Sequence, residues 1–284
     1  MKILSFGEIL WDAFDEEKKI GGAPFNFAAH MAKLGAESYM VSALGNDENG
    51  IEALEEVKKL GIKTDFITKN SFKTGYCRVT LKNGKPSYFL APDVAYDHIG
   101  RHCPLQNFDA LYMGTLALRS AESRRSFEAL MKCVKAKEVF FDVNIRGNNY
   151  TKELLSKLLS VTDILKVSDE EINVFGRGND IIKICLDLSD KYKNLSCIAV
   201  TLGKNGAMVF DCKNKTALFS DVPSGKVVST VGAGDSFSAC FLYNRLMGEP
   251  LDVCLDRAVV LSDYVVTQLG AVPDYPAELI SKIK

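Results

Sequence analysis

A glycine-bearing turn that runs into an apolar helical pattern is the stretch of this chain that most directly suggests chemistry. It reads STVGAGD over residues 229–235. Gly232, Ala233 and Gly234 carry little side chain, so their backbone N–H groups can approach a ligand at the positive end of the helix dipole. Asp235 places a carboxylate beside this anion hole. Such an arrangement is expected if Asp235 takes a proton from a hydroxyl while the N–H groups hold a phosphoryl group. The alternative is an ordinary acidic residue in a first helical turn.

A second glycine cluster, GGAPFN at residues 21–26, opens a helical pattern over 27–34 that Gly35 closes as a C′ residue. Asn26 has two interpretations. Its amide can bind a ligand hydroxyl, or it can cap the helix, since Asn is a favoured N-cap residue. Asp12 follows the first apolar strand, and open α/β sheets bind ligands at the ends of their strands. Asp12 is therefore either a ligand-binding residue or a polar turn residue ahead of a charged run.

Three further segments lie at the ends of apolar strands. KVSDEE at 166–171 contains Ser168 and Glu171, which also have the spacing of a capping box. TLGKNG at 201–206 is a turn with two glycines. DVNIR at 142–146 carries an arginine that either steadies phosphate charge or forms a surface ion pair.

The bulk properties indicate a soluble enzyme. With 284 residues, 47% of them hydrophobic, the chain can bury one large core. A formal net charge of −1 gives no reason to expect nucleic acid or a membrane surface as partner. No apolar run approaches the roughly 20 residues that span a bilayer, and the N-terminal segment reads as a strand and not as a secretory signal. We therefore expect a cytoplasmic protein.

The eight cysteines form no C-x-x-C pair and lie mostly in apolar segments, so we expect reduced, buried thiols. His98, His102 and Cys103 lie close together and suggest a metal site at first sight. The chain holds three histidines and no further ligand pair, so we interpret this segment as a solvated loop.

Strand-like apolar runs alternate with helical patterns, such as those at 49–60 and 123–135. The runs lie at 3–6, 38–42, 110–113, 139–143, 164–167, 197–201 and 207–210. This alternation predicts an α/β fold with a mostly parallel central sheet and helices on both faces.

One region departs from the alternation. Strand-like runs at 74–82 and 85–90 are joined by Asn83-Gly84, a strong hairpin signal. With the segment around 12–20 they predict a small antiparallel sheet that projects from the main domain, although a surface decoration would look the same.

The two glycine clusters, with Gly45 and Gly50 between them, resemble in order and spacing the two signatures of the ribokinase-like (PfkB-type) carbohydrate kinases. Within that family the chain looks most like bacterial fructokinases. The resemblance implies one ribokinase-like domain over residues 1–284. It also implies a β lid, formed by about 12–22 and 72–96, that closes over the sugar and often forms the contact of a homodimer.

The resemblance further implies transfer of phosphate from ATP, with Mg²⁺, to a sugar hydroxyl, with D-fructose the leading acceptor. Asp235 would be the base, and the N–H groups of Gly232, Ala233 and Gly234 would hold the phosphoryl group. The matching sugar-contacting positions are Asp12, Gly22 and Asn26. The matching nucleotide-binding positions are Lys166, Glu171, Thr201, Gly203 and Gly206, with Glu171 reaching Mg²⁺ through water and with Asn144 and Arg146 as further candidates.

The chain departs from the family pattern at two positions. Ser168 stands where the N-x-x-E element has Asn, and Ser229 stands where the family usually has Asp. That Asp helps coordinate a monovalent cation together with carbonyls of a late loop, here around Gly270 and Ala271. Activation by K⁺ therefore stays open.

Other functions compatible with the motifs are phosphorylation of another sugar, such as ribose or ketodeoxygluconate, and phosphorylation of a nucleoside. A nucleoside kinase would need a wall in the lid on which the base stacks, for which Tyr76, Tyr88 and Phe89 are candidates. A non-catalytic sugar sensor is the third alternative. Retention of Asp235 argues against a sensor, because a pure binder needs no base.

Overall fold

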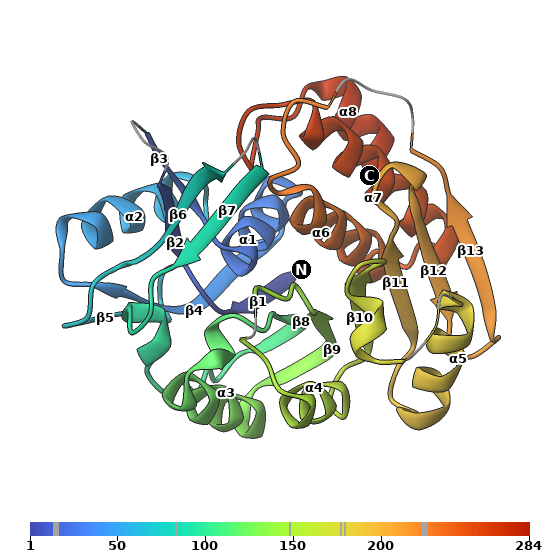
Figure 1. The fold of residues 1–284 in the computed structure, drawn as a ribbon, viewed down its shortest axis with the longest axis horizontal. Coiled ribbons are helices and arrows are strands. Elements are labelled where there is room, and N and C mark those ends of the chain that lie inside the picture. The colour runs from blue at the N-terminus through green and yellow to red at the C-terminus, as the bar shows by residue number, and fades with distance from the viewer. Residues whose placement is uncertain (14–16, 83–84, 148, 177, 179, 223–226) are drawn as a thin grey trace.

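A large twisted sheet forms the centre of the computed structural model, which describes residues 1–13, 17–82, 85–147, 149–176, 178, 180–222 and 227–284. Within these residues the sheet has nine strands (Figure 1). Their spatial order is β13 (Thr216–Ser220), β12 (Ala207–Asp211), β11 (Cys197–Thr201), β10 (Ile164–Ser168), β9 (Lys135–Asp142), β8 (Asn107–Met113), β1 (Lys2–Phe6), β4 (Glu37–Gly45) and β5 (Ile67–Asn70).

The pairing of these strands confirms the predicted sheet. Every neighbouring pair from β11 to β5 is parallel. The pairs β11–β12 and β12–β13 at one edge are antiparallel. Six of the seven predicted strand runs lie within a strand, and the run predicted at 139–143 extends one residue past the end of β9. The helix predicted over 123–135 ends at Cys133 because β9 begins at Lys135.

Helices cover both faces of the sheet. One face packs α3 (Ala121–Cys133), α4 (Lys152–Leu159) and α5 (Ile181–Lys191). The other packs α1 (Ala23–Lys33), α6 (Ala233–Leu246), α7 (Leu251–Val266) and α8 (Ala277–Ile283). Figure 1 shows α3 and α4 below the sheet and α6, α7 and α8 above it. Leu111 and Tyr112 of β8 point into the two opposite cores, as the period of a strand requires. The helix α2 (Glu48–Lys59) packs Ala53 and Val57 against α1 and β4.

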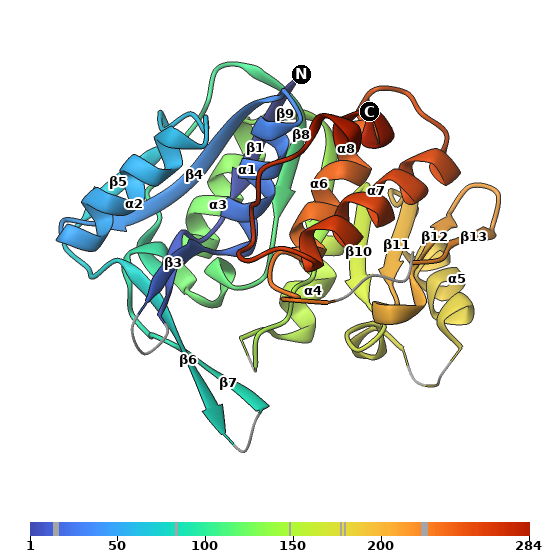
Figure 2. The ribbon, with the colours of Figure 1, turned by 90° about the horizontal axis from the view of Figure 1, so that it is seen from above.

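A second, small sheet projects from this body (Figure 2). Its order within the described residues is β3 (Lys18–Gly21), β2 (Leu10–Ala13), β6 (Gly75–Lys82) and β7 (Lys85–Leu90). The outer pairs, β2–β3 and β6–β7, are antiparallel as predicted, and the central pair β2–β6 is parallel. The predicted turn at Asn83-Gly84 lies outside the described residues.

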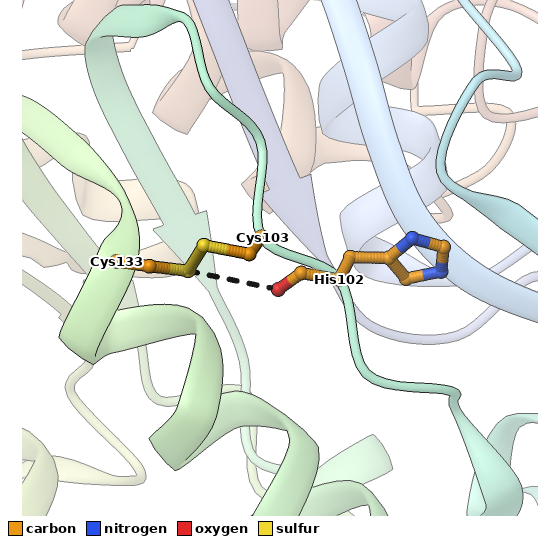
Figure 3. The surroundings of a disulfide bond; sticks show 3 residues. All are labelled: His102, Cys103 and Cys133. Carbon is orange, nitrogen blue, oxygen red and sulfur yellow. Dashed lines mark hydrogen bonds between the residues drawn. A yellow bond between two sulfur atoms is a disulfide. The ribbon is translucent and has the colours of Figure 1, made fainter.

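The prediction that all cysteines are reduced is wrong at one place. Cys103, in the segment before β8, forms a disulfide with Cys133 at the end of α3, with their Cα atoms 5.7 Å apart (Figure 3). The two segments meet only in the folded chain, and a sequence separation of 30 residues carries no motif. The other cysteines in the described residues are free and buried. Across the same residues, no helix combines the length and the apolarity needed to cross a membrane.

Candidate active site

The glycine-bearing turn forms the N-terminus of α6. Gly232 is the N-cap residue and adopts a left-handed φ of 83°. A Cβ atom there would lie 2.6 Å from the Cα atom of Ala271, so both the conformation and the space require glycine. Ala233, Gly234 and Asp235 of the first turn stay partly exposed. The N–H group of Ala233 donates a long hydrogen bond of 3.4 Å to the carbonyl of Thr230, whereas first-turn N–H groups have no partner within the helix.

Asp235 meets Asn26 across the site. The Nδ2 atom of Asn26 donates a hydrogen bond of 2.7 Å to Oδ2 of Asp235. Burial raises the pKa of Asp235 to about 6, and the hydrogen bond from Asn26 opposes the rise. The interpretation of Asn26 as a helix cap is wrong, because α1 already begins at Ala23 with Gly22 as its N-cap. Asn26 is buried, and its Oδ1 atom has no partner among the described residues.

Asp12 lies on β2 in the small sheet, where its neighbours across the two ladders are Lys19 and Cys77. Burial raises the pKa of Asp12 to about 6, while the Arg146 guanidinium lowers it. Gly22 has a φ of 109°, and a Cβ atom there would lie 2.6 Å from the carbonyl oxygen of Glu8. The start of α1 therefore lies close to the backbone of Glu8, two residues past β1.

Glu8 is a site residue that the sequence reasoning missed. It is 2% exposed, and its Oε2 atom has no partner among the described residues. Burial raises the pKa of Glu8 to about 7, and the nearby Asp235 carboxylate adds to the rise. The positive charge of Arg146 opposes this rise in pKa, and it also opposes the rises at Asp12 and Asp235. The carboxyl groups of Glu8, Asp12 and Asp235 therefore share one cationic neighbour. In the sequence, a glutamate inside an apolar strand pattern could have pointed to this residue.

Lys166 lies on the other side of the α6 N-terminus. Its Nζ atom is buried, 3.0 Å from Oδ1 of Asp142 at the end of β9. A Cβ atom on Gly234 would lie 3.0 Å from the same Nζ atom, which places the ammonium group directly beside the turn.

Glu171 ties two loops together. Its Oε1 atom accepts a hydrogen bond of 2.6 Å from the N–H of Ile145, and its Oε2 atom accepts bonds of 2.9 Å from the N–H and the hydroxyl of Ser168. The N–H of Glu171 donates to Oγ of Ser168 at 3.3 Å, so the capping-box contacts form, although only the 3₁₀ turn η3 (Ile172–Val174) follows. Asn144, two residues past β9, takes a left-handed φ of 38°. The exposed Arg146 therefore follows a loop whose backbone Glu171 holds.

The predicted nucleotide loop lies next to this segment. Thr201 ends β11, and its carbonyl accepts a hydrogen bond of 2.9 Å from the N–H of Asp169. The 3₁₀ turn η4 (Gly203–Asn205) follows, and Gly206 takes a left-handed φ of 85° before β12. The loop is thereby positioned at the same edge of the sheet as Lys166.

A buried histidine fixes the far side of the turn. Burial lowers the pKa of His30 to about 3, so its ring is neutral. Its Nε2–H donates to the carbonyl of Ala271 at 2.9 Å, and its Nδ1 accepts from the hydroxyl of Tyr275. Since Ala271 packs on Gly232, His30 holds the late loop against the anion hole.

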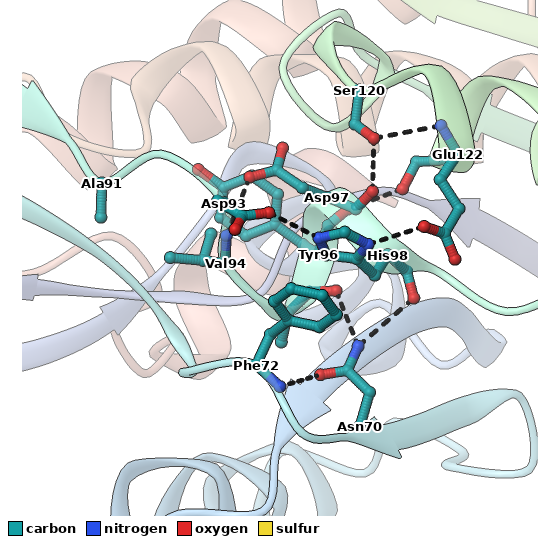
Figure 4. Close-up of polar contacts among 12 residues, drawn as sticks. Asn70, Phe72, Ala91, Asp93, Val94, Tyr96, Asp97, His98, Ser120 and Glu122 are labelled. Atoms are coloured by element: carbon teal, nitrogen blue, oxygen red, sulfur yellow. Dashed lines mark hydrogen bonds and ion pairs between the residues drawn. The ribbon is translucent and has the colours of Figure 1, made fainter.

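Polar contacts also fix the base of the small sheet (Figure 4). His98 is not a solvated side chain, because it stacks on Phe72 and bonds to Asp93 at 2.8 Å and to Glu122 at 2.7 Å. Burial opposes the charge of His98, but the two carboxylates outweigh it and raise its pKa. Arg119 binds the carbonyl of Ala91, just past β7, at 2.5 Å. The ends of the projecting strands are thus attached to the body near α3.

Comparisons with known proteins identify the family of this chain. The family described as pfkB family carbohydrate kinase matches residues 2–278. A putative sugar kinase from Pyrococcus horikoshii is 31% identical over 281 residues, covering 88% of this chain and 84% of the relative. Probable fructokinase-5 from Arabidopsis thaliana is 28% identical, covering 96% of this chain and 94% of the relative.

Solved structures share the fold. The crystal structure of 2-dehydro-3-deoxygluconokinase from Thermotoga maritima superposes with a TM-score of 0.84 at 23% identity, covering 100% of this chain and 99% of that chain. An uncharacterized sugar kinase from Pyrococcus horikoshii in complex with ATP gives a TM-score of 0.72 at 26% identity, covering 95% and 94%. A family match over nearly the whole chain, on the predicted fold, means that this protein belongs to the pfkB family of carbohydrate kinases.

Proposed function

We propose that this sugar kinase transfers the γ-phosphoryl group of ATP to a hydroxyl of D-fructose. The observation that carries the proposal is the pairing of Asp235 and Asn26 at the open N-terminus of α6. A carboxyl group whose pKa lies near 6 is ionised at neutral pH and still basic enough to accept a hydroxyl proton.

In the proposed reaction Asp12, Gly22 and Asn26 orient the sugar. Asp235 takes the hydroxyl proton while the sugar oxygen forms a bond to phosphorus and the bond to the leaving ADP oxygen breaks. The N–H groups of Gly232, Ala233 and Gly234 stabilise charge on the moving group, where one such donor is worth about 3 kcal/mol. The proposed nucleotide contacts are Lys166, Thr201, Gly203 and Gly206, with Asn144 and Arg146 beside them.

Mg²⁺ fits this proposal as an ion that arrives with the nucleotide. Both oxygens of Glu171 already accept hydrogen bonds from the protein, which favours contact with the metal through water and not directly. The ion would neutralise phosphate charge. No step requires a monovalent cation at Ser229, whose hydroxyl accepts a hydrogen bond from the N–H of Val231 at 3.3 Å.

The choice of fructose rests on the plant fructokinase relative. The lid predicted at about 12–22 and 72–96 would be built on the small sheet, within a single kinase domain over residues 1–284. The proposal includes a homodimer formed through the lid. Dependence on ATP suits a cytoplasmic enzyme.

A coupled ADP-release assay over fructose, ribose, ketodeoxygluconate and nucleosides tests the proposal. Fructose should give the highest kcat/KM. Asp235→Asn should lower kcat by about 10³-fold, because general-base catalysis contributes 10²–10⁴, while calorimetry shows little change in sugar affinity. Activity of Asp235→Asn within tenfold of the wild type would show that Asp235 is not the base. A higher kcat/KM with another acceptor would show that fructose is not the preferred substrate.

A further inference from the structure

Asp142 is a fully buried carboxylate that no part of the proposed mechanism uses. Within the described residues it accepts hydrogen bonds from three elements. Lys166 of β10 donates to Oδ1 at 3.0 Å, and Ser238 of α6 and Tyr112 of β8 donate to Oδ2 at 2.9 Å and 3.2 Å. Burial raises the pKa of Asp142, and the charge and hydrogen bond of Lys166 and the hydrogen bond of Ser238 oppose the rise. With both oxygens engaged, the carboxyl group is held in one orientation.

The location of Lys166 explains why such a carboxylate is needed. Its ammonium group lies beside Gly234, at the positive end of the α6 dipole, where a second positive charge is unfavourable. Burial also opposes its charge, but the carboxylates of Asp142 and Glu171 outweigh burial and raise the pKa of Lys166. Lys166 and Asp142 are direct neighbours in the parallel pairing of β9 and β10, so the backbone itself sets their distance.

The remaining bonds to Asp142 link it to the reacting groups. Ser238 lies one helical turn after Asp235 on α6, so its bond fixes the helix that carries the base. Tyr112 stacks on Phe27 with ring centroids 3.9 Å apart, and Phe27 is the neighbour of Asn26. One buried carboxylate therefore aligns the strands and helices on which Asn26, Asp235 and Lys166 lie.

We propose that Asp142 is the positioning residue of this kinase, and that it holds Lys166 charged and aimed at the anion hole so that the ammonium group meets the transferring phosphate. Among the described residues, Asp142 is the hydrogen-bond acceptor of Lys166, which leaves two of the three ammonium N–H bonds for phosphate oxygens or water. The inference rests on the proposed function.

The first test is Asp142→Asn in the intact chain. Loss of the negative charge should lower kcat by about 100-fold and leave the sugar KM within about threefold. The alkaline limb of the kcat profile should move to lower pH, since Lys166 loses the charge that keeps it protonated. Glu138→Gln is the matched control, because it removes a carboxylate of the same strand that pairs with Arg245 at 3.8 Å. An alkaline limb unchanged in Asp142→Asn would overturn the proposal.

The second test is a double-mutant cycle, which stays informative if Asp142→Asn folds poorly. A carboxyl group left without its ammonium partner takes up a proton and becomes neutral, so Lys166→Met remains foldable. If Asp142 acts through Lys166, adding Asp142→Asn to Lys166→Met should change kcat by less than about threefold. A further loss of tenfold or more would overturn the inference. A wild-type protein without kinase activity would instead refute the proposed function.

Discussion

The pairing of Asn26 with Asp235 makes a prediction about pH. Asn26→Ala removes the N–H donor that lies 2.7 Å from the carboxylate and leaves Asp235 in place. A hydrogen bond to a charged group contributes about 1.5–3 kcal/mol, and one pKa unit corresponds to about 1.4 kcal/mol. The pKa of Asp235, about 6 in the wild type, should therefore rise by about one to two units.

The direction of this change can be measured. Asp235 works as a base only when it is ionised, so activity falls as the pH drops through its pKa. In Asn26→Ala the acid limb of the kcat/KM profile should move from near pH 6 to about pH 7–8, and much of the activity should return in alkaline buffer. Loss of sugar contacts by Asn26 would lower the whole profile without shifting it.

The assay is the ADP-release rate at low sugar concentration, recorded from about pH 5 to about pH 10. Asn194→Ala is the control, because this side chain donates a hydrogen bond to the carbonyl of Leu159, the last residue of α4, away from the site. An acid limb that stays in place in Asn26→Ala, with activity lowered equally at every pH, would refute the reasoning.

Three further variants test separate parts of the structure. Asp12→Ala should raise the sugar KM about 10- to 100-fold, as expected for lost hydrogen bonds to a charged group; steady-state kinetics with an unchanged KM would reduce Asp12 to a turn residue. Gly232→Ala should lower the free energy of unfolding, measured in urea, by about 1–3 kcal/mol, because the φ of Gly232 is left-handed and the new Cβ atom would press on Ala271. A free energy of unfolding equal to that of the wild type would contradict this prediction. His98→Asn should lower Tm more at about pH 5.5 than at about pH 8.5, since a raised pKa stabilises at low pH and this contribution is lost as pH rises through it; equal losses would show that the ion pairs with Glu122 and Asp93 contribute nothing.

The central sheet could be predicted from the sequence because each of its inner strands is buried on both faces. Such strands read as short apolar runs, and the runs at β1, β8 and β10 are of this kind. The short strand β5 and the edge strand β13 escaped prediction. Their side chains are mostly half exposed or exposed, so the hydrophobic pattern that marks a strand is missing.

The site could be predicted only where its chemistry is local. The N-terminus of α6 is defined by four successive residues, whereas the contact of Asn26 with Asp235 joins positions 209 residues apart. Asn26 looked equally like a helix cap because the positive φ of Gly22, which starts α1 earlier, is not visible in the sequence. The bond from Ser238 to Asp142 spans 96 residues and carries no motif.

The bond between His30 and Ala271 has a consequence for how the enzyme is made. The anion hole needs the loop between α7 and α8 in place, because Ala271 is the surface against which the bend at Gly232 rests. His30, which secures that loop, emerges from the ribosome some two hundred and forty positions earlier. A chain made only as far as α7 can thus contain every strand of the sheet and still lack the residue on which Gly232 rests, so the anion hole depends on a contact that forms after the sheet is complete in sequence.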